Sequence, residues 1–307
     1  MTLFLTLLGK IIPLYFSILL GFFSTKFFNC DKETIAKILL FILAPLIVFN
    51  ATISVQIKPS ILFLPTFFFT ISVLIAFICL PIFYKIFKDN SANVLSFSVA
   101  TGNTGNLGIP VAILFLSPSM VDVFIFTVLA SILYQNSIGY YITAKSNFTI
   151  TQSLLKVAKL PVLHAFILGI SLNLLGFKIP EIFIDYTNYL KGAYAILGMM
   201  LLGMGMEKLK TSGGFDLKFI GIALLVKFVV WPAIVLGFIV LDTQFFHFLN
   251  KELYLVMFIF SIVPLAGNTV TIATILNVKP EKMSLAVLIS TLVSLFYIPL
   301  MLYWYNF

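Results

Sequence analysis

The stretch TGNTGNLGIP occupies residues 101–110 and interrupts an apolar segment that is long enough to cross a membrane. Its three glycines, two asparagines and one proline are not compatible with one continuous helix. In lipid, irregular backbone persists only where protein or a water-filled cavity surrounds it, because unpaired N–H and C=O groups cannot reach water. A second interruption, PLAGNT, occupies residues 264–269. Paired interruptions in the two halves of a chain indicate a transporter's binding site.

The composition is that of an all-α polytopic membrane protein. The chain is 61% hydrophobic and 10% charged, contains 34 Phe and has a mean hydropathy of +1.13. Most apolar segments exceed the ~20 residues that span a bilayer, and 161–176 must use its flanks to do so. The N-terminal run lacks a basic region and a cleavage site, so we interpret it as a retained first helix. Ten transmembrane helices are predicted, at 3–25, 34–55, 61–84, 92–116, 121–142, 161–176, 188–206, 219–241, 253–277 and 283–304.

The formal charge of +8 reflects topology rather than a nucleic-acid partner. Every basic residue is Lys, and with alternating loops thirteen of the nineteen fall on one side of the membrane. Positive residues stay cytoplasmic, so both termini are expected to face outward from a cell (inner) membrane. The abundance of Lys, Phe, Ile and Asn is typical of an AT-rich bacterial genome.

The predicted spans divide into two halves of five, 1–150 and 151–307. An odd number of spans inverts the second copy relative to the first, as in inverted-repeat transporters. The fourth span of each half carries Gly-Asn-Thr, at 102–104 and at 267–269. The loops are too short for a soluble domain and the chain has no phosphate-binding loop for ATP. Secondary transport or a channel therefore remains.

The two interruptions are the candidate anion site. Each exposes the N–H groups and the positive dipole end of a new half-helix, which favour a carboxylate. Asn106 and Asn268 suit helix N-caps, and Pro110 suits a first helical turn. The predicted substrate-binding residues are Asn103, Thr104, Gly105, Asn106, Pro110, Pro264, Asn268, Thr269 and Lys227. Residues that line a cavity in this interpretation are Thr101, Asn50, Gln135 and Asn136. The alternative is that the glycines and asparagines only pack and pair helices.

Lys227 lies inside a predicted span, roughly 12 Å from its cytoplasmic start at ~1.5 Å per residue. It either counters the charge of a substrate or extends its side chain to the interface. No Asp or Glu lies deep in any predicted span, which argues against a proton relay or a cation site built on carboxylates. No catalytic residue, metal site or cofactor is predicted.

The interrupted segments resemble those of the auxin efflux carrier family, which includes bacterial malate and malonate permeases and plant PIN-type carriers. The fourth-span motif corresponds to 103–105 followed by 107–110, and Asn106 stands where an aromatic residue is commoner. Four other stretches resemble further spans of that family. The run from Pro264 to Thr269 resembles the ninth span, and the run from Lys159-Leu160-Pro161 to Pro180 resembles the sixth. Lys227 with Pro232 resembles the eighth span, and Pro45 with Phe49 the second.

The resemblance implies two inverted five-helix repeats with broken crossing helices 4 and 9. Spans 1, 2, 6 and 7 would form a scaffold, and spans 3–5 and 8–10 a transport domain. It also implies elevator-type motion, homodimers and asparagines that bind a substrate carboxylate. The family includes proton-coupled, sodium-coupled and uncoupled members, so a coupling ion remains possible.

We therefore expect a secondary transporter for a small organic anion, a mono- or dicarboxylate such as malate, malonate or an auxin-like acid. The nearest rival is a bile-acid-type sodium symporter, which would show more acidic or polar sodium ligands near the crossing. A channel or a membrane sensor is a further alternative. The expected partners are the anion, membrane lipid and a second copy of the chain.

Overall fold

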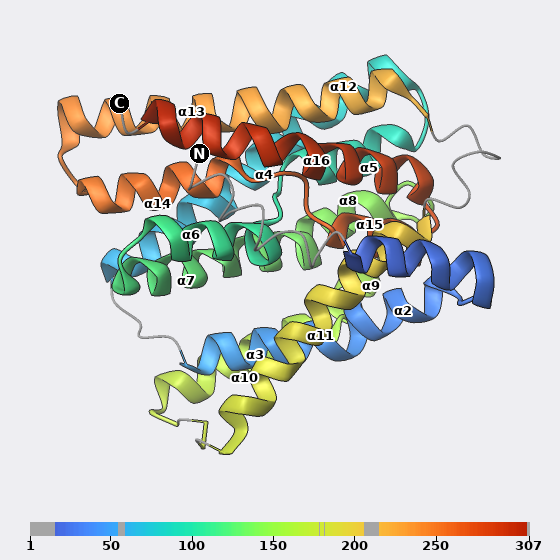
Figure 1. The fold of residues 1–307 in the computed structure, drawn as a ribbon, viewed down its shortest axis with the longest axis horizontal. Helices are drawn as coiled ribbons and strands as arrows, with labels where there is room; N and C mark the ends of the chain where they lie inside the picture. The colour runs from blue at the N-terminus through green and yellow to red at the C-terminus, as the bar shows by residue number, and fades with distance from the viewer. Residues whose placement is uncertain (1–15, 55–58, 178, 181, 206–214, 306–307) are drawn as a thin grey trace.

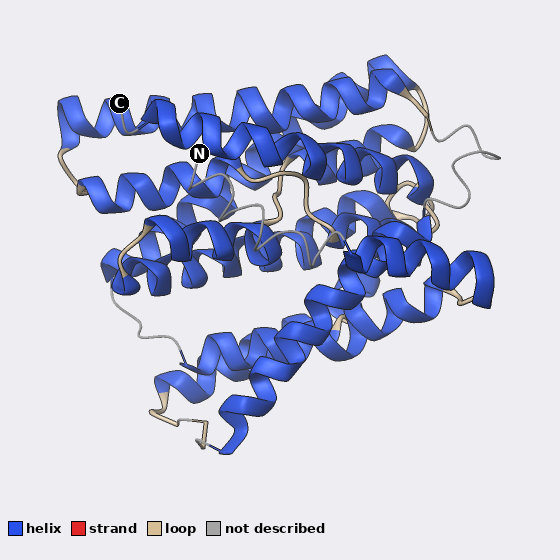
Figure 2. Ribbon diagram, in the orientation of Figure 1, coloured by secondary structure: helices blue, strands red, loops and turns tan. Residues whose placement is uncertain are grey.

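The computed structural model describes residues 16–54, 59–177, 179–180, 182–205 and 215–305, and every regular element in them is a helix (Figure 2). Those of the first half are α2 (Lys32–Ile38), η1 (Leu39–Leu43), α3 (Ala44–Ser54), α4 (Pro59–Phe87), α5 (Ser91–Val99), η2 (Thr104–Gly108), α6 (Ile109–Phe115), α7 (Pro118–Tyr134), η3 (Gln135–Gly139) and α8 (Tyr140–Ala144), where η marks a π-helical turn. Those of the second half are α9 (Ile150–Ala158), α10 (Pro161–Leu174), α11 (Ile182–Gly205), α12 (Leu217–Leu225), η5 (Val226–Val230), α13 (Trp231–Leu241), η6 (Asp242–Phe246), α14 (Lys251–Ile262), α15 (Asn268–Ile275) and α16 (Pro280–Tyr305).

The prediction of a multi-pass helical protein is confirmed. Five helical stretches are long and apolar enough to cross a membrane: Lys32–Ser54, Leu62–Phe87, Val123–Ala144, Leu217–Phe246 and Pro280–Tyr305. A bent pair, Ile150–Lys156 with Pro161–Leu174, forms a sixth if its 53° bend lies within one span. Phe16–Phe28 and Gly192–Leu201 are shorter apolar helices. The predicted fourth and ninth spans are each divided into two half-helices, α5 with α6 and α14 with α15.

Three of the π-helical turns end shortly before a proline. Pro45, Pro110 and Pro232 each lie two residues after the end of η1, η2 and η5. A proline ring collides with the carbonyl four residues before it and cannot donate to that carbonyl. The wider π turn relieves the collision, and a neighbouring side chain can satisfy the freed carbonyl. The Tyr297 hydroxyl does so for Phe228, four residues before Pro232.

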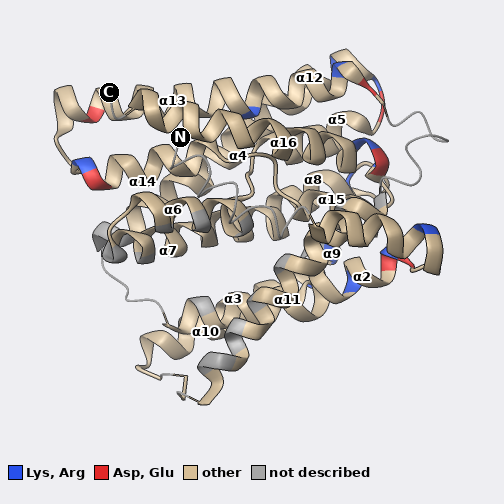
Figure 3. Ribbon diagram, in the orientation of Figure 1, with Lys and Arg blue, Asp and Glu red and all other residues tan. Residues whose placement is uncertain are grey.

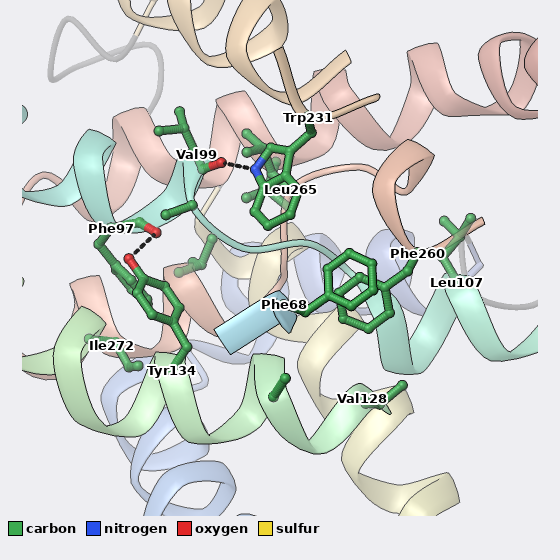
Figure 4. Close-up of a cluster of buried hydrophobic side chains, with 14 of the residues drawn as sticks. Phe68, Phe97, Val99, Leu107, Val128, Tyr134, Trp231, Phe260, Leu265 and Ile272 are labelled. Carbon is green, nitrogen blue, oxygen red and sulfur yellow. Dashed lines mark hydrogen bonds between the residues drawn. The ribbon is translucent and has the colours of Figure 1, made fainter. Parts of the chain in front are cut away.

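The helices form two groups that run in different directions (Figure 1). The first group, α2, α3, α10 and α11, runs obliquely, and α3 packs along α10. Within the same group, α11 approaches the helix Phe16–Phe28 so closely that a Cβ at Gly203 would lie 1.8 Å from the Ile18 carbonyl oxygen. The second group contains α4 to α8 and α12 to α16, in which α4 packs against α5 and α7. Its core includes Phe68, Trp231 and Phe260 (Figure 4).

Charged residues are concentrated near the helix ends, and most of the length of the described helices carries none (Figure 3). Lys282 bridges Asp216 (2.8 Å) and Ser91 Oγ (3.3 Å), which joins the starts of α16, α12 and α5. Although burial alone raises it, hydrogen bonds from Lys282 and the Phe219 N–H hold the pKa of Asp216 below its usual value. Loops that the sequence assigns to one side of the membrane therefore meet at one end of the molecule.

Candidate functional site

The two interrupted segments cross and touch. The chain leaves α5 after Val99 and starts η2 at Thr104, and it leaves α14 after Ile262 and starts α15 at Asn268. The Asn103 N–H donates a hydrogen bond to the Pro264 carbonyl at 2.8 Å. A Cβ added at Gly102 would lie 2.7 Å from Val263 Cγ2, so a larger residue here would displace the side chains packed against it. We call residues 100–105 and 263–269 the crossover.

Carbonyl groups where α5 ends at the crossover have hydrogen-bond partners. The Trp231 indole Nε1 donates to the Val99 carbonyl at 2.7 Å, and the Tyr134 hydroxyl donates to the Phe97 carbonyl at 3.3 Å (Figure 4). In the second break the Pro264 carbonyl accepts from Asn103, and Ser290 Oγ accepts from the Leu265 N–H at 3.2 Å. Buried backbone groups without such partners would destabilise both breaks.

The starts of the two half-helices, by contrast, have no side-chain cap from the residues whose side chains are described. The N-cap of η2 is Asn103 and that of α15 is Gly267, and neither end receives a side-chain hydrogen bond. The predicted capping roles of Asn106 and Asn268 are therefore wrong. The first half-helix begins earlier than expected, at Thr104, because it opens as a π turn, and Asn268 is already the first helical residue. Both starts carry a positive dipole end, but in α15 the Thr269 and Val270 N–H groups already donate to the Ala266 and Gly267 carbonyls.

Open space lies beside both uncapped starts. A Cβ added at Gly105 or at the buried Gly267 would meet no atom of the described residues within 4 Å. The Asn103 side chain is only 4% exposed, and its Nδ2 has no hydrogen-bond partner among the described residues. A buried amide donor without a partner costs about 1–3 kcal/mol, which a bound acceptor would recover. The crossover thus has a packed side at Gly102 and an open side at Gly105 and Gly267.

Asn268 belongs to a chain of side-chain hydrogen bonds that connects four elements. Its Nδ2 donates to Gln135 Oε1 at 2.9 Å, and Gln135 Nε2 donates to Thr101 Oγ1 at 2.8 Å. The Tyr194 hydroxyl donates to Asn268 Oδ1 from α11, in the other group of helices. Gln135, predicted to line the cavity, thus links Asn268 to Thr101 within the crossover, and the second Asn268 Nδ2 hydrogen has no partner among the described residues.

The other predicted residues divide into those at the crossover and those away from it. Thr104 and Thr269 are buried, and the Thr269 hydroxyl donates to the Ala266 carbonyl at 2.6 Å. Pro110 is the second residue of α6. Asn136 is buried and donates to the Ile132 carbonyl of its own helix. Asn50 donates to its own helix at the Leu46 carbonyl and shares no hydrogen bond with the crossover in the part of the chain described.

Lys227 lies in η5 and points into the protein. Its side chain is 1% exposed, and Nζ lies 4.6 Å from the centroid of the Trp231 ring. A Cβ added at Gly102 would lie 2.8 Å from Nζ, so the ammonium group reaches the packed side of the crossover. The interfacial alternative is therefore wrong, because the side chain ends at the crossover rather than at the end of its helix.

This fold, with two broken helices that cross and leave uncapped starts, defines a multi-pass membrane transport protein. Residues 145–302 match the family model described as "Membrane transport protein". The chain is also 31% identical over 298 residues to "Uncharacterized transporter MJ1031" of Methanocaldococcus jannaschii, covering 92% of this chain and 94% of that relative. The chain belongs to the membrane transport protein family, that of the auxin efflux carriers, and it is a transporter rather than an enzyme.

Three residues of the site were not predicted from the sequence. Trp231 supplies the donor for the Val99 carbonyl, Tyr194 holds Asn268, and Ser290 accepts from Leu265. Trp231 stands between Lys227 and Pro232, one helical turn after the lysine. Its position could therefore have indicated an indole hydrogen-bond donor near the site. Tyr194 and Ser290 carry no local signal, since their partners lie 74 and 25 residues away in the chain.

Proposed function

We propose that the protein is a secondary transporter for a small organic anion with one or two carboxylates, such as malate, malonate or an auxin-like acid. The carboxylate binds on the open side of the crossover. It accepts hydrogen bonds from Asn103 Nδ2, from the second Asn268 Nδ2 hydrogen, and from backbone N–H groups at the start of η2. Lys227 adds a net positive charge from the packed side.

One observation carries this proposal: the buried Asn103 Nδ2, which has no hydrogen-bond partner among the described residues, lies at a crossing of two half-helix starts beside open space. Half-helix N-termini near a crossing suit anionic groups, because donors and dipole ends converge there. A carboxylate has about four lone-pair sites and can satisfy several such donors together. A neutral ligand would make fewer of these hydrogen bonds.

Transport proceeds, in this proposal, by elevator-type alternating access with ten spans in two inverted five-helix repeats, 1–150 and 151–307. The oblique group with α2, α3, α10 and α11 serves as the scaffold and mediates a homodimer in the inner membrane. The second group carries the crossover and moves as the transport domain. The separate directions of the two groups support this division (Figure 1).

The bile-acid-type sodium symporter fits the crossover less well. Among the described residues, Lys227 and Asp242 are the buried charged side chains, and Asp242 is committed to Phe248, Leu249 and Tyr254. A cation site built on carboxylates therefore has no available acid there. A channel or a sensor is also less favoured, because neither function requires a buried binding site such as the one proposed at the crossover.

Binding and flux together test the proposal. Purified protein is screened by thermal shift against mono- and dicarboxylates, with matched neutral amides as controls, since a ligand of the native state raises apparent stability. Uptake of a radiolabelled hit into proteoliposomes should saturate and show counterflow. Flux that neither saturates nor exchanges would favour a channel, and stabilisation by the amides alone would exclude an anion site.

A further inference from the structure

We propose that the Lys227 ammonium is a resident cation at the carbonyl ends of the first half-helices, in the place that a coupling sodium ion would take. The transporter is then independent of sodium because its cation is covalently attached. The inference concerns the proposed crossover site, but the cation itself can be tested without any carboxylate.

The position of Nζ is the first support. The two residues nearest to a Cβ built at Gly102 are Val263 and Lys227, at 2.7 and 2.8 Å. Gly102 follows the last residues of α5, and Val263 directly follows α14. The ammonium group therefore lies where both first half-helices end. It does not lie beside Gly105 and Gly267, where the second half-helices begin.

The electrostatics of helix ends give the second support. Each C-terminus carries a partial negative charge of roughly half an elementary charge, and half-helix C-termini with unwound carbonyls are where coupling cations bind in transporters. Two such ends next to one another favour a positive charge between them. The N-termini on the open side favour an anion. The crossover thus separates a cation position from an anion position.

The partners of Lys227 give the third support. An isolated buried ammonium is strongly unfavourable, so a compensating field is required. Nζ makes no hydrogen bond or ion pair within the described part of the chain, and its one recorded interaction is with the face of Trp231. The buried Asp242 lies fifteen residues further along the chain, roughly 22 Å at ~1.5 Å per residue. The partial negative charges of the two helix ends and the face of the Trp231 ring therefore stabilise the buried ammonium. In this role Lys227 does not itself contact the carboxylate.

Chemical replacement of the cation tests the proposal. Lys227→Ala removes the equivalent of propylammonium, so this variant should be stabilised by propylammonium, with a saturable rise in Tm of about 2 °C or more. Tetramethylammonium, which is too bulky, should not reproduce the rise. Lys218→Ala, which removes a lysine near the start of α12, is the matched control and should not respond. Lys227→Met fills the same volume without charge and should not respond either.

The parent protein supplies a second readout that does not depend on the folding of a variant. Its Tm should be equal in sodium and choline chloride at the same ionic strength, and malonate, if bound, should bind with the same affinity in both. A saturable sodium-specific stabilisation of the parent would overturn the proposal. So would a Lys227→Ala protein that is as stable as the parent and indifferent to propylammonium. Failure of the parent to bind any carboxylate would instead reject the proposed function, while the cation measurements still decide the role of Lys227.

Discussion

Asn103 and Asn268 occupy corresponding places in the two breaks but are not equivalent. Asn103 Nδ2 has no hydrogen-bond partner among the described residues, whereas Asn268 is held by Tyr194 and Gln135. Loss of the Asn268 side chain therefore disturbs a network that extends to α11, while loss of the Asn103 side chain removes only a donor. The sequence presents the same Gly-Asn-Thr in both places, and only long-range partners separate the two roles.

Trp231 is the residue whose loss most directly tests how the first break is stabilised. Trp231→Phe leaves the Val99 carbonyl buried without its 2.7 Å donor. We expect unfolding to become easier by about 1–3 kcal/mol. Denaturant unfolding of the purified protein measures this, with Trp304→Phe as the control because Trp304 is 59% exposed. Equal stability of the two variants would show that the indole hydrogen bond is not needed.

Among the elements, the interrupted helices were predictable from sequence but their starts were not. Glycine, asparagine and proline together predict a break, and the structure breaks both segments there. The prediction of N-cap roles for Asn106 and Asn268 failed because it assumed α-helical geometry. The half-helix that follows the first break instead begins with the π turn η2, which accommodates Pro110. Proline position thus predicts the distortion, but the residue at which the helix begins depends on how the distortion is accommodated.

The contact between the helix Phe16–Phe28 and α11 gives an element-level prediction. A Cβ at Gly203 would lie 1.8 Å from the Ile18 carbonyl oxygen, whereas a Cβ at Gly198 in the same helix meets no described atom within 4 Å. Gly203→Ala should therefore force the helices apart and destabilise the protein by about 1–3 kcal/mol or more. Gly198→Ala should be neutral or slightly stabilising. Matched thermal unfolding of both variants tests the contact, which similar losses of stability would contradict.

For the molecule as a whole, lysine asymmetry and the alternation of spans predict sidedness. The loop ends near Asp89, Asp216 and Lys279 meet in ion pairs at one end of the fold. This agrees with their assignment to one side of the membrane. The grouping of helices into two directions was not available from composition, because composition does not indicate which helices pack together. It was implied only by the resemblance to a family of carriers.

Thiol labelling in intact cells tests that sidedness. In a chain with Cys30 and Cys79 replaced by Ala, Thr151→Cys should be shielded from a membrane-impermeant reagent, and Pro180→Cys should react. Both positions are exposed in the structure, so a difference in labelling reports the membrane rather than burial. Membrane permeabilisation should expose Thr151→Cys as the control. The opposite pattern would invert the orientation drawn from the positive-inside rule.

The central claim is that a carboxylate binds at the crossover, and equilibrium binding to Asn103→Ala tests it most directly. Loss of a hydrogen bond to a charged group costs about 1.5–3 kcal/mol, so affinity for the carboxylate that binds the parent should fall roughly 10–150-fold. Asn103→Asp should bind still more weakly, because it places a negative charge beside the anion. Asn93→Ala is the control: Asn93 is a buried amide on α5 paired with Ile142 and Tyr84, so its loss should lower stability but not affinity. Parent-like carboxylate affinity in both Asn103 variants would contradict an anion site at the crossover.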